Sequence, residues 1–142
     1  MNADGSAERQ LTSNSSYDAE PAWNPDGTLI YFASETGKNF DIHSIKLDGS
    51  EETNISRTPN TNEGVIGFTT DGNEIFCLGD SEGKFAFNQI YRMSIDGEKR
   101  QQISSFTDKV FRAAYSQAAR KFVLVARREG NFEIYSMDAP PN

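Results

Sequence analysis

The stretch Glu20-Pro-Ala-Trp-Asn-Pro-Asp-Gly-Thr-Leu-Ile-Tyr-Phe-Ala-Ser34 decides the fold, because the chain repeats its pattern twice. Pro25-Asp26-Gly27 is typical of a tight turn, since proline fixes a negative φ and glycine accepts a positive one. The segments on either side of this turn, 22–23 and 29–32, are rich in aromatic and β-branched residues. Two strands joined by a tight turn are therefore predicted.

Three landmarks recur in the same order along the whole chain. Asp-Gly pairs lie at 4–5, 48–49 and 96–97, so their spacings are 44 and 48 residues. The other landmarks keep similar spacings: Leu11-Thr12, Ile55-Ser56 and Ile103-Ser104, then Trp23, Phe68 and Tyr115. A period of this length is the signature of a repeat architecture. It divides the chain into units at about 1–49, 50–97 and 98–142.

Each unit can be written as four strands. The first strand places a bulky aromatic beside a small residue, as in Ala22-Trp23. The second is apolar at consecutive positions (29–33, 75–78 and 122–126), which predicts burial on both faces. The third alternates, and the fourth is short and polar, as an exposed edge requires. No window has a sustained helical periodicity, so little helix is expected.

Four-stranded units of about 45 residues are typical of β-propeller blades. The pattern Pro21-x-Trp23-x-Pro25-Asp26-Gly27, continued by Ile30-x-Phe32, Ile42, Asp48-Gly49 and Ile55-Ser56, resembles the repeat of TolB-like β-propellers, the WD40-like beta repeat or PD40. Unit two keeps Asp71-Gly72 but has Phe68 in place of tryptophan, and unit three lacks both Asp-Gly turns.

This resemblance implies an all-β fold in which residues 1–142 form a single half-propeller domain. The chain would contribute three four-stranded antiparallel blades to a six-bladed ring. The resemblance extends to propeller domains attached to prolyl oligopeptidase-like enzymes. A peptidase is not implied, because the sequence has no Gly-x-Ser-x-Gly nucleophile elbow.

Composition excludes several classes of partner. The net charge of −7 argues against a nucleic acid or an anionic membrane surface, both of which reward clustered Lys and Arg. No apolar run is long enough to span a membrane, so no membrane insertion is expected. The polar start at 1–5 is not a signal peptide. A cytoplasmic location is favoured, and a periplasmic one would need a leader that has been removed.

The residues that could carry chemistry are few. The only histidine, His43, takes the position of Tyr91 and Tyr135 in the other units and is interpreted as a strand-filling aromatic. The only cysteine, Cys77, excludes an internal disulfide and is interpreted as a buried hydrophobe. The Asp-Gly pairs lack the alternating ligands of a calcium loop. No catalytic residue, metal or cofactor is predicted.

Two sets of loops are expected to ring one mouth of the channel. They are the loops that enter the first strands (13–20, 57–65 and 105–112) and those between second and third strands (35–40, 80–88 and 127–132). The candidate binding residues lie there: Asp18, Glu20, Glu63, Asp108, Arg112, Phe85 and Phe87. Function concentrates on loops that a rigid scaffold holds, and aromatic and Arg side chains dominate binding. The Asp-Gly turn face is expected to be inert.

Three functions fit these observations. The first is a non-enzymatic propeller module that binds a protein or peptide at its loop face. The second is an enzyme-associated propeller, or a degenerate lyase or hydrolase, with Asp18 and Glu63 as paired carboxylates at the channel mouth. The third is a structural or engineered half-propeller with no ligand.

The two ends of the chain predict a homodimer. Residues 8–12 supply a fourth strand with no blade of its own, and 134–137 form a third strand with no fourth strand after it. Unpaired strand edges seek partners, so two chains would close a six-bladed ring. The rival interpretation is a piece of a longer propeller chain, whose further blades would cover the same edges. Trp23 is then expected to pack against an adjoining blade, and its replacement by alanine to cost about 3–5 kcal/mol.

Overall fold

The computed structural model describes residues 2–80 and 89–141 of the 142-residue chain. Within them, strands form three antiparallel sheets and there is no helix, hence none that could cross a membrane. The strands are β1 (Asp18–Trp23), β2 (Leu29–Thr36), β3 (Asn39–Lys46), β4 (Thr53–Asn54), β5 (Glu63–Phe68), β6 (Glu74–Gly79), β7 (Gln89–Ser94), β8 (Arg100–Gln102), β9 (Lys109–Ser116), β10 (Lys121–Arg128) and β11 (Asn131–Asp138).

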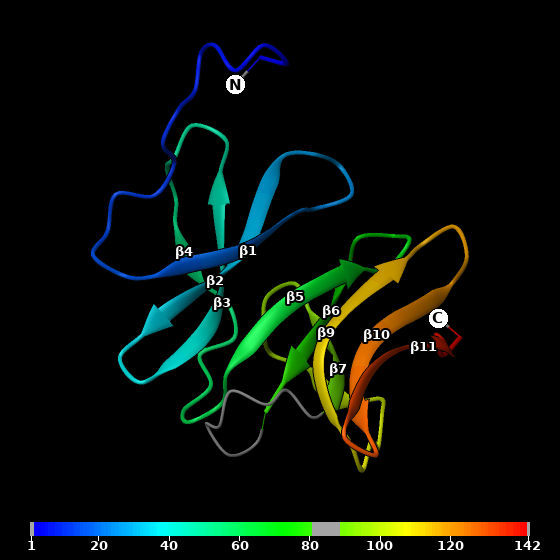
Figure 1. The fold of residues 1–142 in the computed structure, drawn as a ribbon. Helices are drawn as coiled ribbons and strands as arrows, with labels where there is room; N and C mark the ends of the chain where they lie inside the picture. Colours follow the sequence, from blue (N-terminus) through cyan, green and yellow to red (C-terminus); the bar gives the residue numbers. More distant parts are fainter. Residues whose placement is uncertain (1, 81–88, 142) are drawn as a thin grey trace.

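The three sheets are successive propeller blades. Blade 1 has the order β1-β2-β3-β4, blade 2 has β5-β6-β7-β8, and blade 3 has β9-β10-β11. The first strand of blade 2, β5, contacts both β1 and β9, and the three form the inner wall from which the sheets fan outward (Figure 1). The predicted all-β blades are thereby confirmed. Blade 3 has three strands among the described residues, because no strand follows β11 there.

The Asp-Gly turns close the hairpins by a repeated hydrogen bond. The carboxylate of Asp26 accepts the backbone N–H of Thr28 at 2.8 Å, and Asp48 accepts that of Ser50 at 2.9 Å. Asp71 and Asp96 do the same with the second residue after each. The glycine that follows each of these aspartates has a positive φ of 72° to 83°. Turn chemistry therefore explains these pairs.

The cores lie between blades rather than inside them. Tyr31 of blade 1 contacts Phe68 of blade 2 edge-on, with ring centroids 5.1 Å apart. Phe76 of blade 2 contacts Tyr115 and Phe122 of blade 3 at 4.7 and 5.0 Å. Tyr31 and Phe76 occupy the same register in successive units, as do Phe68 and Tyr115. The two internal interfaces are thus built to one pattern.

Burial of the second strands follows from these interfaces. Residues 31–34 of β2 and 75–79 of β6 are buried, as the apolar runs predict. In β10, Phe122, Leu124 and Ala126 are buried but Val123 is 48% exposed. Blade 2 covers one face of blade 3, and no described residue covers the other. The prediction of burial on both faces is therefore wrong for β10.

Trp23 differs from the expectation in the same way. It was expected to pack against an adjoining blade, yet it is 59% exposed. The reason is that blade 1 is the first in the chain, and its outer face has no neighbouring sheet among the described residues. Within a single chain, Trp23→Ala cannot have the cost of a buried aromatic. The blade 1 face is open.

Residues 8–12 are not paired as a strand, but their position repeats that of a fourth strand. The carbonyl oxygen of Leu11 lies over Gly49, where an added Cβ would meet it at 2.9 Å. The carbonyl of Ile55, directly after β4, lies over Gly97 in the same way. The Arg9 guanidinium also donates to the carbonyl of Asp48. Residues 8–12 therefore contact blade 1 in the way that Ile55, which follows β4, contacts blade 2.

Candidate functional site

The inner wall of β1, β5 and β9 places side chains toward the loop face. Each of these strands has a β-bulge or register shift, between Ala19 and Ala22 in β1 and between Val65 and Gly67 in β5. Such an irregularity redirects a side chain away from the strict alternation of a strand. Glu20 lies inside the first bulge with a φ of 54°, a value that costs energy for any residue with a side chain. Its direction is therefore set by the bulge.

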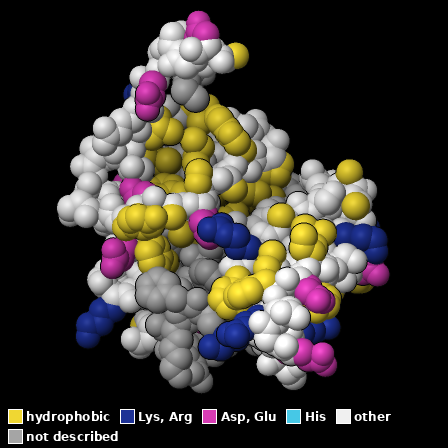
Figure 2. Space-filling model, viewed as in Figure 1, with side chains coloured by type: hydrophobic (Ala, Val, Ile, Leu, Met, Phe, Trp, Pro, Cys, Tyr) yellow, Lys and Arg dark blue, Asp and Glu magenta, His cyan; other side chains and the backbone are white. Residues whose placement is uncertain are grey.

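Glu20 and Arg112 meet across blade 2. The Arg112 Nη1 atom of blade 3 lies 3.3 Å from the Glu20 Oε1 atom of blade 1. Gly64 of β5 permits this approach, because a Cβ there would overlap the Glu20 carboxylate. The Arg112 side chain is 76% exposed. In Figure 2 a basic and an acidic group touch near the centre of this face, between the blades.

A cavity of about 370 Å³ adjoins this pair. Its lining consists of Tyr17, Ala19, Glu20, Ala33, Phe40, Glu63 and Arg112. The rings of Tyr17 and Phe40 form one side, edge to face with centroids 6.0 Å apart. Opposite charges and aromatic surface therefore share one hollow at the channel mouth. We call Tyr17, Glu20, Phe40 and Arg112 the mouth site.

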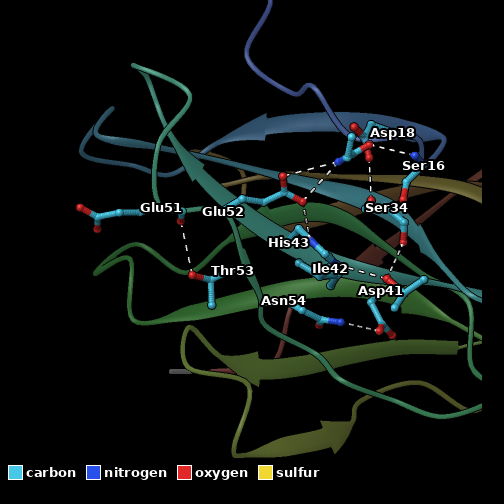
Figure 3. Close-up of polar contacts among 12 residues, drawn as sticks. Ser16, Asp18, Ser34, Asp41, Ile42, His43, Glu51, Glu52, Thr53 and Asn54 are labelled. Carbon is cyan, nitrogen blue, oxygen red and sulfur yellow. Dashed lines mark hydrogen bonds and ion pairs between the residues drawn. The ribbon is translucent and has the colours of Figure 1, made fainter.

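Asp18 and Asp108 do not join the mouth site. Asp18 accepts a hydrogen bond from the Ser34 hydroxyl at 2.6 Å (Figure 3) and borders the open face of blade 1. Asp108 pairs with Arg128 at 2.7 Å on blade 3. Phe85 and Phe87, the aromatics predicted to contact a ligand, lie outside the described residues. Their role stays a prediction.

Glu63 borders the cavity, but its side chain is fully buried between blades 1 and 2. Its Oε1 atom lies 2.8 Å from Arg100 Nη2, and Oε2 accepts from the Thr58 hydroxyl at 3.2 Å. Burial raises the pKa of Glu63, and the Arg100 charge opposes that rise. No interaction joins Glu63 to Asp18 among the described residues. The carboxylate pair that acid–base chemistry would need is therefore not formed by these two.

Glu63 should make the stability of the blade 1–blade 2 interface depend on pH. Because its pKa is higher in the folded chain than the ordinary value of 4.5, its contribution is fully present below that value. The contribution is lost as the pH rises through the folded pKa. We expect Glu63→Gln to reduce this decline between 4.5 and neutrality. Urea unfolding of parent and variant across that range measures it, and parallel curves would contradict it.

The surroundings of His43 and Cys77 indicate structural roles. The His43 Nδ1 atom lies 3.0 Å from Glu52, which Figure 3 shows on the outer part of blade 1. Cys77 is fully buried in the interface between blades 1 and 2, and burial raises the pKa of its thiol. In the ranges 2–80 and 89–141, no group of three His, Cys, Asp or Glu side chains could hold a metal.

Sequence reasoning missed three residues of this region. Tyr17 precedes β1 and reads as a loop residue, so its contact with Phe40 has no local signal. Gly64 could have been noticed, since a glycine inside a strand often marks a close approach. Arg100 lies far along the chain from Glu63, and only the folded blade brings them together.

No family model matches the sequence, and no curated protein matches it either. Solved structures do match. A protein assigned to TolB from Agrobacterium tumefaciens superposes with a TM-score of 0.71 at 22% identity, over 90% of this chain and 47% of that one. TolB from Acinetobacter baumannii gives 0.69 at 22% identity, over 90% and 31%. A puromycin-hydrolyzing peptidase from Mycobacterium tuberculosis gives 0.69 at 14%, over 95% and 22%.

The chain spans less than half the length of each of these structures. Sequence identities this low support a shared fold and carry no statement about activity. The repeated register of the three blades, the Asp-Gly turns and the superpositions agree with one another. The chain has the TolB-like β-propeller fold.

Proposed function

We propose that this chain is a propeller module that binds a protein or peptide segment at its mouth site. The observation that carries the proposal is the Glu20–Arg112 pair, 3.3 Å apart with the Arg112 side chain exposed, beside the rings of Tyr17 and Phe40 in one cavity. Arginine and aromatic side chains are the commonest anchors of protein interfaces. The other end of the blades carries turns whose polar groups already bond within each turn.

The cavity suits a short extended segment. Its volume of about 370 Å³ accommodates one or two side chains rather than a folded surface. Among the described residues Arg112 contacts Glu20 through a single nitrogen, so its other donors can bind a carboxylate. Glu20 offers an acceptor to a backbone N–H or a basic side chain. Tyr17 and Phe40 present apolar surface beside both charges.

The proposal includes a ring of six blades made by two copies of the chain. Three blades leave a ring incomplete, since closed propellers have about four to eight. A second copy would place a second mouth site around the same channel. Two linked sites raise the apparent affinity for a bivalent or repeated partner.

Selection from a random peptide library on the immobilised parent chain tests the binding. We expect enriched peptides to bind Arg112→Ala at least about tenfold more weakly, the loss of one anchor. Phe40→Ala should show a similar loss, because it removes the apolar side of the cavity. Lys99→Ala, an exposed cation at the Asp-Gly turn between β7 and β8, is the matched control and should bind as the parent does. Equal binding by all four proteins would overturn the proposal.

A further inference from the structure

We propose that the open face of blade 1 is the seat for blade 3 of a second copy of this chain, packed head to tail. The inference rests on the proposed two-chain ring and specifies which faces meet. The hollow that defines the blade 1 open face is lined by Leu11, Trp23, Ile30, Phe32 and Ile45, of which Trp23 is exposed and Phe32 and Ile45 are buried. The blade 3 open face consists of Ala114, Val123, Val125 and Ile134.

The blade 1 open face is hollowed. A half-open hollow of about 420 Å³ lies between the N-terminal segment and the sheet. Figure 2 shows hydrophobic side chains lining a hollow beside β1. Trp23 at its rim is 59% exposed, whereas Phe68, its equivalent in blade 2, is 7% exposed. The surface of blade 1 is therefore a blade interface without its neighbour.

The blade 3 open face is the other half of such an interface. Ile134 is 79% exposed and Val123 is 48% exposed. Their equivalents in blade 2, Ile90 and Phe76, are 0% and 2% exposed because blade 3 covers them. A hollow of about 260 Å³ lies over this apolar surface. Both ends of the chain thus expose residues that the internal interfaces bury.

The two open faces match in register. Inside the chain, Tyr31 contacts Phe68 and Phe76 contacts Tyr115. Val123 occupies in the third unit the position that Tyr31 and Phe76 occupy in the first two. Trp23 occupies in the first unit the position of Phe68 and Tyr115. Continuing the pattern places Val123 of one copy against Trp23 of the other. A large indole then fills the volume that the smaller valine leaves.

The strand edges match as well. The carbonyl of Ile42 accepts from Ile55 N–H at 2.7 Å, and Ile42 N–H donates to the Ser56 hydroxyl at 2.9 Å. Ile90 makes the same two bonds with Ile103 and Ser104, at 2.9 and 2.8 Å.

The groups that would form a third such pair of hydrogen bonds lie at opposite ends of the chain. Ile134 lies on β11, which has no neighbour on its outer side among the described residues. Leu11-Thr12 stands at the matching position of the N-terminal segment, with a hydroxyl in place of the serine. Ile134 of one copy therefore bonds to Leu11 and Thr12 of the other.

Light scattering on the full chain is the first test. The parent should have twice the 15.8 kDa mass of one chain. Ile134→Asp buries a charge in the proposed interface and should give the mass of a single chain. Because Ile134 is 79% exposed in one chain, this variant should fold normally, which its circular dichroism checks. Ile95→Asp, on an exposed turn, is the matched control and should keep the parent mass.

Crosslinking identifies the faces. An added Cβ at Gly67 would lie 2.7 Å from the Tyr115 Cβ, and Ala114 and Trp23 are the equivalent pair across the proposed contact. The double variant Trp23→Cys with Ala114→Cys should form an intermolecular disulfide, whereas either single variant should not. Cys77 is fully buried and does not compete.

The outcomes separate the inference from the proposed function. A parent of single-chain mass overturns both the seat and the two-chain ring, and leaves peptide binding to its own test. A parent of double mass that keeps this mass in Ile134→Asp and forms no crosslink overturns the seat alone, because the copies then meet elsewhere. Double mass, loss of the dimer in Ile134→Asp and a crosslink in the double variant support it.

Discussion

Replacing Gly97 with alanine should lower the free energy of unfolding by about 3 kcal/mol. Gly97 has a φ of +83°, a left-handed conformation that costs a residue with a side chain roughly 1–2 kcal/mol. An added Cβ would also overlap the backbone carbonyl of Ile55, and overpacking of this kind typically costs about 1–3 kcal/mol. Ile55 bonds to Ile42 in the blade 1–blade 2 junction, so the carbonyl cannot move freely. Urea unfolding measures the loss.

Gly27→Ala is the matched control for this prediction. Gly27 belongs to the same kind of Asp-Gly turn and has a φ of +72°, but nothing lies within 4 Å of its added Cβ. It should therefore lose only the conformational part, roughly 1–2 kcal/mol. Similar losses in the two variants would show that the Ile55 carbonyl does not restrict Gly97.

Phe76→Ala should destabilise the chain by about 3–5 kcal/mol, as expected when a buried aromatic is truncated. Phe76 is 2% exposed and contacts both Tyr115 and Phe122. It therefore links blades 2 and 3 through two ring contacts. Thermal unfolding followed by tyrosine fluorescence should report the loss, since Tyr115 changes its surroundings when the blades part.

Phe132→Ala controls for the removal of a phenylalanine as such. Phe132 is 59% exposed and its ring contacts Phe111 at 4.9 Å on the surface of blade 3. We expect it to cost about 1 kcal/mol or less. If Phe76→Ala costs no more than this control, then the blade 2–blade 3 core is not the main source of stability.

The fold could be predicted because each repeat carries its own local signals. Turn residues such as Asp26-Gly27 act within a few positions, and an apolar run such as 75–78 indicates a buried strand without knowledge of its neighbours. What the sequence could not show was which repeats have neighbours. Val123 has the sequence character of a buried residue, and Trp23 even more so, yet no sheet among residues 2–80 and 89–141 covers either of them.

The candidate site could be predicted only in part. The sequence assigned both Glu20 and Arg112 to the loops at the channel mouth, and the structure brings them to 3.3 Å. Glu63 was assigned to the same surface, but a half-buried arginine partner from a strand far along the sequence cannot be seen in a local pattern. The aromatic side of the cavity depends on how the segment before β1 folds back, which no periodicity describes.

Cys77 can report how often blades 1 and 2 separate transiently in the folded protein. The thiol lies in the interface between blades 1 and 2 beside Tyr31 and Phe68, and it is the only thiol in the sequence. A reagent can reach it only while these blades are transiently apart. When reclosing is faster than modification, the rate of labelling is proportional to the population of the opened form. The rate of alkylation at Cys77 therefore measures the free energy of opening the interface between blades 1 and 2, without unfolding the whole protein.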